Sequence, residues 1–262
     1  MKTGEEWQDL LSVPGTEDHI VQVYTEPAFL VEGVAAYVGT GLKQNDAAII
    51  IARPEHRALF EAELERRGFD VASLIARGQL RLLDAADTLA QFMRGSLPDW
   101  AAFHKLIGGV IAETRLQYPS VRAYGEMVDI LWHEGKRDAA IKLEEFWNKL
   151  ISLQTFSLFC AYRMDNFASE TYAGPLQCIC RVHSHLIPAR DYAAFNKSVI
   201  EASQAVLGAP LAKVLKTIST QAAPSAQMPE GQAALLCCEK RCRAPLKRCW
   251  TSCALDESGR WL

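Results

Sequence analysis

Residues 178–185 contain four side chains of the types that commonly ligate metal ions: Cys178, Cys180, His183 and His185. Thiolate sulfur and imidazole nitrogen are the preferred donors for Zn²⁺. In an extended chain the two cysteines point one way and the two histidines point together. The connecting chain is too short for all four to surround one tetrahedral ion. Two of them with Cys160 or His19 would suffice, and the alternative is ordinary hydrogen-bonded loop histidines.

A phosphate-binding loop is missing from the turns where an α/β fold would carry one. The first turn, Tyr24 to Phe29, contains no glycine or lysine, and its Glu26 would repel phosphate. The run from Gly39 to Lys43 lacks the Walker spacing, and we expect it to end a helix, so its amides are not free to bind an anion. The sequence therefore argues against an ATPase.

Strand and helix patterns alternate along the body of the chain. Apolar runs bounded by turns predict strands at five places: 19–25, 47–52, 80–83, 121–124 and 156–162. Helical spacing fills the intervals, with stops at Gly41, Gly68 and Gly135. We read residues 176–190 as short and irregular, and a last helix from Tyr192 or Ser198 to Ile218. This order predicts an α/β fold of three layers, with a mainly parallel sheet of about five or more strands and right-handed crossovers.

Composition is that of an ordinary globular protein. Of 262 residues, 49% are hydrophobic and 23% charged, and the net charge of −3 gives no general attraction to nucleic acid or membrane surfaces. No apolar run reaches the length of a membrane span, and none follows the basic residue at the N-terminus. We therefore expect a cytoplasmic protein.

Cysteine is concentrated at the C-terminal end. Five of eight cysteines lie in the last 26 residues, after a segment rich in Pro and Gly. We expect a linker and poorly ordered tail at 223–262, with a small metal module, a redox tail or an altered reading frame as alternatives. The other predicted parts are an extension at 1–16, the main domain at 17–190 and a helical segment at 191–222. Gly208 and Pro210 divide that segment, so we expect two docking or dimerising helices.

Six short motifs in a fixed order resemble the MEDS domain, the sensory domain of DcmR-type proteins from methanogens and methylotrophs. They are His19 with Tyr24, Gly41-Leu42 with Asp46, Gly125-Glu126-Met127-Val128 with Leu131-Trp132, Leu143-Glu144 with Trp147-Asn148, Phe159-Cys160-Ala161-Tyr162, and His183-Ser184-His185 with Pro188. The resemblance implies a RecA/KaiC-like fold without the phosphate loop, and a sensor of small hydrocarbon derivatives in signalling or transcription proteins. We find no helix-turn-helix before residue 17 and no kinase pattern after residue 190.

Candidate ligand contacts follow from this resemblance and from positions at the strand ends. They are His19, Tyr24, Glu126, Trp132, Cys160, Tyr162, His183 and His185. Four of them have a plainer interpretation: His19 as a strand-start histidine, Tyr24 as a packed ring, Glu126 as a carboxylate at a helix N-terminus and Cys160 as a packed thiol. The aromatic residues suit a core or the lining of an apolar pocket.

The remaining histidines sit beside charged residues on predicted helices: His56, His104 and His133. We expect these three to be solvated.

The predicted function is a non-enzymatic sensory domain that needs no cofactor. It would bind a small molecule and relay the signal to a signalling or transcription partner, with no direct nucleic acid or membrane contact and a homodimer contact through 192–222. Two alternatives stand: a metal- or thiol-dependent protein that uses Cys160, Cys180, His183 and His185, and an interaction module on a degenerate ATPase core.

Overall fold

The computed structural model of the chain describes residues 7–165, 168, 171, 175–221 and 226–241. They divide into two compact units. The first holds the described residues up to Gln22 and Glu26–Arg163, and the second holds Val23–Thr25 and the described residues from Met164 on. Each unit is described by itself.

Six of the described strands form one sheet, in the order β3-β2-β6-β7-β1-β8. Its strands are β1 (His19–Tyr24), β2 (Ala47–Ala52), β3 (Leu80–Asp84), β6 (Val121–Gly125), β7 (Ser157–Arg163) and β8 (His185–Ile187). Strand β2 runs parallel to β3 and β6, and β6 runs parallel to β7. The predicted three-layer α/β class is confirmed.

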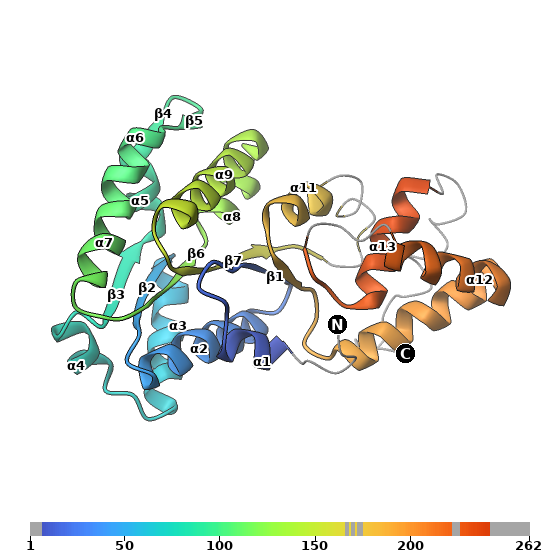
Figure 1. The fold of residues 1–262 in the computed structure, drawn as a ribbon, viewed down its shortest axis with the longest axis horizontal. Coiled ribbons are helices and arrows are strands. Elements are labelled where there is room, and N and C mark those ends of the chain that lie inside the picture. The colour runs from blue at the N-terminus through green and yellow to red at the C-terminus, as the bar shows by residue number, and fades with distance from the viewer. Residues whose placement is uncertain (1–6, 166–167, 169–170, 172–174, 222–225, 242–262) are drawn as a thin grey trace. The chain divides into compact units, whose positions relative to one another are not determined.

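Strand β2 shows why the apolar runs become central strands. All six of its residues are buried, because helices cover both faces of the sheet in the first unit (Figure 1). Alternation of polar and apolar residues is unnecessary in such a strand. The same holds for β6, whose five residues are all buried.

The helices of the first unit lie on two faces of the sheet (Figure 1). One face carries α1 (Trp7–Ser12), α2 (Pro27–Lys43), α3 (Pro54–Arg66) and α4 (Val71–Ala76). The other carries α5 (Ala85–Phe92), α6 (Trp100–Phe103), the π-helix η1 (His104–Gly108), α7 (Gly109–Arg115), α8 (Met127–His133) and α9 (Arg137–Leu153). Proline stands in the first turn of both α2 and α3, where its missing N–H and fixed φ suit a helix start.

Some local features of the first unit differ from the sequence-based expectation. Residues 7–12, placed in an extension, form α1, and its buried Trp7 packs edge to face on Phe29 at a centroid distance of 5.5 Å. A small hairpin of β4 (Met93–Arg94) and β5 (Leu97–Pro98) was not predicted. Two-residue strands are too short to give a periodic signal.

The second unit contains α11 (Pro175–Val182), β8, α12 (Tyr192–Gln221) and α13 (Glu230–Arg241). Residues 176–190 are therefore not irregular, since most of them form a helix and a strand. The predicted division of the last helix is present, because Gly208 has φ of 76° inside α12. Helix α13 occupies part of the predicted linker and tail. The rest of that tail, residues 242–262, lies outside the described residues.

Among the described residues, no helix combines the length and the apolar character that crossing a bilayer requires.

Helix α3 carries a pH-dependent ion pair. Glu63 accepts hydrogen bonds from Arg66 and Arg67 at 2.7–2.8 Å, and these two arginines, Arg66 most of all, lower the pKa of Glu63 to about 2. We expect Glu63→Gln to lower the free energy of unfolding by up to about 1 kcal/mol at neutral pH, since such surface pairs are screened by water. The pair's contribution is present above the ordinary pKa of 4.5 and is lost as pH falls toward 2.

Denaturant unfolding of both proteins at several pH values measures this difference. The exposed Glu65 of the same helix supplies the control, Glu65→Gln. An equal loss in the two variants, or a loss that does not depend on pH, would show that the pair contributes nothing.

Candidate functional site

The carboxyl ends of β2 and β6 are neighbours in the sheet, and the connections that follow these two strands leave in opposite directions. After β2 the chain passes through α3 and α4 to β3, and after β6 it passes through α8 and α9 to β7, on the opposite face (Figure 1). Parallel sheets bind ligands at such points, outside the carboxyl ends of strands whose connections diverge. We therefore examined the side chains that these two strand ends present.

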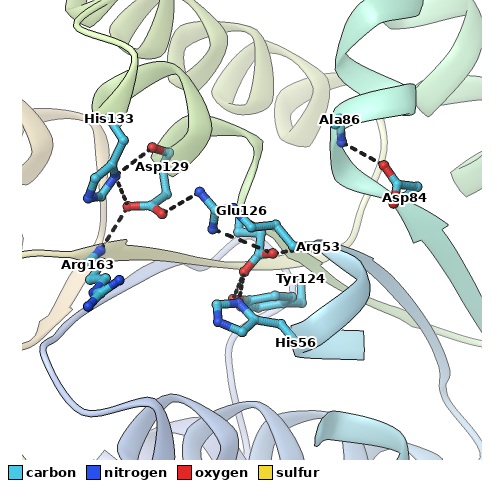
Figure 2. A network of polar contacts seen from close by, with 9 residues as sticks. All are labelled: Arg53, His56, Asp84, Ala86, Tyr124, Glu126, Asp129, His133 and Arg163. Atoms are coloured by element: carbon cyan, nitrogen blue, oxygen red, sulfur yellow. Dashed lines mark hydrogen bonds and ion pairs between the residues drawn. The ribbon is translucent and has the colours of Figure 1, made fainter. Parts of the chain in front are cut away.

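Glu126 stands directly after β6 and is the centre of a polar network (Figure 2). Its side chain is only 1% exposed. One carboxylate oxygen accepts a short bond from the backbone N–H of Arg53, and the other is 2.6 Å from His56 Nδ1 and 3.3 Å from the hydroxyl of Tyr124. The guanidinium of Arg53 also lies 3.7 Å from Glu126 Oε1, as an ion pair longer than a hydrogen bond.

Asp129, one turn further along α8, joins a third strand end to the network (Figure 2). It is 2% exposed and accepts from Arg53 Nη2 at 2.8 Å and from the backbone N–H of Arg163, at the end of β7, at 2.9 Å. His133 Nδ1 lies 3.1 Å from the same carboxylate. One arginine thus holds two buried carboxylates, and the contacts connect the ends of β2, β6 and β7.

Asp84, at the end of β3, has a different role. Its carboxylate accepts from the backbone N–H of Ala86 at 2.9 Å and caps helix α5 (Figure 2). Its other oxygen lies 3.2 Å from Arg57. These contacts are those of an ordinary helix cap.

A second polar cluster lies between β1, β7 and helix α9, within the first unit. His19 Nε2 is 3.4 Å from Cys160 Sγ and 3.2 Å from Glu144 Oε2, and the thiol is 3.7 Å from the same carboxylate oxygen. Tyr162 donates to Glu144 Oε1 at 2.7 Å, and Asn148 Oδ1 is 2.9 Å from His19 Nδ1. Burial, followed by the charge of Glu144, raises the pKa of both the Cys160 thiol and the Tyr162 hydroxyl.

A comparison with protein-family models decides the family. The model of the MEDS domain, described as "MEthanogen/methylotroph, DcmR Sensory domain", matches residues 18–184, well over half of the chain. The chain belongs to the MEDS family. Its sensory character is thereby shown, as is the resemblance inferred from the six motifs. No curated protein matches the chain.

The structure places the residues predicted to contact a ligand in this MEDS domain at more than one location. His19, Cys160 and Tyr162 meet around Glu144, and Trp132 packs edge to face on Tyr162 at 5.7 Å. Glu126 belongs to the network at the strand ends.

The other predicted contacts belong to the second unit. Tyr24 is buried at the end of β1, and its carbonyl accepts from the backbone N–H of Met164. His183 is buried with Nδ1 2.7 Å from the carbonyl of Ile179, and His185 is 2.9 Å from Ser184 Oγ.

The extended conformation that would point Cys178 and Cys180 the same way is not present. Residues 175–182 form α11, which places Cys178 and Cys180 about 200° apart around the helix axis. Cys178 is exposed and Cys180 is buried. These two cysteines therefore do not face one ion together.

His56 was also placed wrongly, among solvated histidines. Its ring is 14% exposed, contacts Glu126 and packs on Phe60 at a centroid distance of 6.0 Å. Solvent does reach the other two histidines of that group, since His104 is exposed and the side chain of His133 is 48% exposed.

Besides His56, the candidate ligand contacts inferred from the sequence omit several side chains of the two polar groups, although Glu144 and Asn148 stand in one of the six motifs: Arg53, Tyr124, Asp129, Glu144 and Asn148. Glu144 has a detectable signal, because it occupies the spacing of Ala140, Trp147 and Ile151 on the buried face of α9. A carboxylate at a core position requires partners in the interior. Arg53 has a weaker signal, as the first residue after a fully buried strand.

Proposed function

We propose that this MEDS domain is a non-enzymatic sensor that binds a small, weakly polar molecule, such as a hydrocarbon derivative, at the carboxyl ends of β2 and β6. The observation that carries the proposal is the pair of buried carboxylates, Glu126 and Asp129, held by Arg53 where the connections of the two strands diverge. The family match supports the sensory role.

The chemistry of the network suits a ligand with one polar group. Carboxylate oxygens accept from a hydroxyl or amine, and a guanidinium donates to an oxygen or a halide. Arg53 and His56 are 24% and 14% exposed, so solvent reaches the network from their side. A ligand group that enters beside Arg53 can exchange with its 3.7 Å contact to Glu126.

Binding here would reach several elements at once. Arg53 and His56 lie at the start of α3, Glu126 and Asp129 at the start of α8, and Arg163 ends β7. A ligand changes the output only when it binds one arrangement of these elements better than the other. We propose that the signal passes to a signalling or transcription partner in the cytoplasm, with residues 192–222 as the docking or dimerising segment.

The experiment is thermal unfolding of the full chain with a panel of short-chain alcohols, aldehydes, amines and haloalkanes. A ligand of about four non-hydrogen atoms binds no more tightly than roughly 40 µM, at about 1.5 kcal/mol per atom. At tenfold its dissociation constant the best ligand stabilises by about 1.4 kcal/mol, which raises Tm by about 3–5 °C.

Glu126→Gln is the informative variant. We expect it to bind the same ligand about tenfold more weakly, which reduces the shift to roughly 1 °C at the same concentration. Glu145→Gln is the matched control, because Glu145 is 52% exposed and pairs with Lys142 at the surface. The proposal fails if no compound in the panel shifts Tm, or if both variants retain the full shift.

A further inference from the structure

The three donor atoms of the second cluster form a compact triangle. His19 Nε2, Glu144 Oε2 and Cys160 Sγ are separated by 3.2, 3.4 and 3.7 Å, and all three side chains are buried. An imidazole, a carboxylate and a thiol are the three protein donor types that bind Zn²⁺.

The sides of this triangle match a tetrahedral metal centre. Bonds of about 2.05 Å to nitrogen and oxygen and about 2.3 Å to sulfur at tetrahedral angles separate N from O by about 3.4 Å. The same geometry separates sulfur from either atom by about 3.6 Å. The observed separations agree to within about 0.2 Å, so one ion would reach all three donors without movement of the backbone.

The neighbours of the triangle are arranged as the outer contacts of a metal centre usually are. Asn148 Oδ1 lies 2.9 Å from His19 Nδ1, so Nδ1 carries a proton, and in the neutral imidazole Nε2 presents its lone pair. Tyr162 donates to Glu144 Oε1 at 2.7 Å, which leaves Oε2 to face the thiol and the imidazole. Each of these contacts orients a donor.

Electrostatics in the triangle favour a cation. With Nδ1 protonated, Nε2 and Oε2 direct lone pairs at each other across 3.2 Å, and the Cys160 thiol, which donates to Oε2, supplies only one hydrogen to the point between the three atoms. A second proton on His19 would remove this repulsion between lone pairs, because it would make an imidazolium that pairs with Glu144. A divalent ion at that point satisfies all three donors, and its charge favours the thiolate that burial otherwise opposes.

We propose that His19, Glu144 and Cys160 bind a divalent transition-metal ion of the Zn²⁺ type inside the first unit. This site shares no residue with the network of Glu126 and Arg53. The two proposals can therefore fail separately.

Cobalt substitution tests the site directly, because Co²⁺ reports on thiolate ligation. The full chain is used with its five C-terminal cysteines changed to serine, which leaves Cys160, Cys178 and Cys180. The reduced protein is titrated with Co²⁺ and then Zn²⁺. We expect one Co²⁺ per chain, a thiolate-to-cobalt charge-transfer band, intense tetrahedral visible bands, and displacement of all of these by Zn²⁺.

Variants assign the signal to the triangle. Cys160→Ser is expected to abolish the charge-transfer band, and the exposed Cys178 gives the matched control Cys178→Ser, which keeps it. Asn148→Ala and Tyr162→Phe are expected to weaken Co²⁺ binding about 10- to 100-fold while keeping the band. Circular dichroism confirms that each variant is folded.

Two results would overturn the metal site. The first is the absence of a thiolate-to-cobalt band in the parent protein, which would leave His19 and Glu144 as a protonated ion pair. The second is a band that survives Cys160→Ser, which would assign the ion to other thiols. The parent spectrum decides the first result even if a variant fails to fold.

Discussion

Replacing Arg122 with methionine is expected to lower the midpoint of thermal unfolding by about 10 °C. Arg122 projects from β6 and is almost completely buried. Its guanidinium donates to the carbonyls of Leu11, Ser12 and Tyr37, to Gln44 Oε1 and to Asp46 Oδ2, at 2.8–3.2 Å. Removal leaves several buried acceptors and a carboxylate without their donor, which costs about 3–5 kcal/mol.

The same substitution at Arg81 is the matched control, measured by the same thermal unfolding. Arg81 lies on β3 and pairs with Glu113, whose side chain is 61% exposed. Such a pair contributes less than about 1 kcal/mol, so Arg81→Met should lower Tm by no more than roughly 3 °C. Equal losses in the two variants would contradict the role of Arg122 as the link between α1, α2 and the sheet.

The second large effect is expected at Arg53, where a double-mutant cycle measures the network. Arg53→Met removes the only guanidinium that the structure places on Glu126 and Asp129 among the described residues. We expect it to lower the free energy of unfolding by about 3 kcal/mol, because two carboxylates that are 1% and 2% exposed lose their countercharge. Denaturant unfolding at neutral pH gives this value.

The cycle is completed with Asp129→Asn and the double variant. If Arg53 stabilises the buried charges, removal of one carboxylate reduces the cost of losing the arginine, and the coupling free energy is about 1–3 kcal/mol. Additive losses would show that Arg53 and Asp129 do not act together. The proposed site would then lack the electrostatic connection between β2 and α8.

Much of the first unit could be predicted from local sequence patterns. The apolar run from Ala47 to Ala52 predicted a strand, and strand β2 is present there. The second unit was harder, because the sequence from Pro175 to Ile187 is short and rich in residues that suit several conformations. Short elements receive their structure from tertiary contacts that periodicity does not record.

The candidate site could be predicted only in part, for a related reason. Glu126 was found because its place at a strand end is a local property. His56 and Glu144 were missed as functional groups because a charged or titratable residue on a helix is usually solvated. Their burial depends on partners about 70 and 16 positions away in the chain, Glu126 and Cys160. Such pairing follows from the topology of the sheet.

Side-chain NMR of the histidines tests the proposed ligand site most directly. The full chain is titrated with the panel compound that gives the largest thermal shift, and nitrogen–proton correlations of the six imidazoles are followed. The proposal predicts that the resonances of His56 move with the binding curve while those of the exposed His104 stay fixed. A saturable titration in which His56 does not respond would contradict a ligand site at the carboxyl ends of β2 and β6.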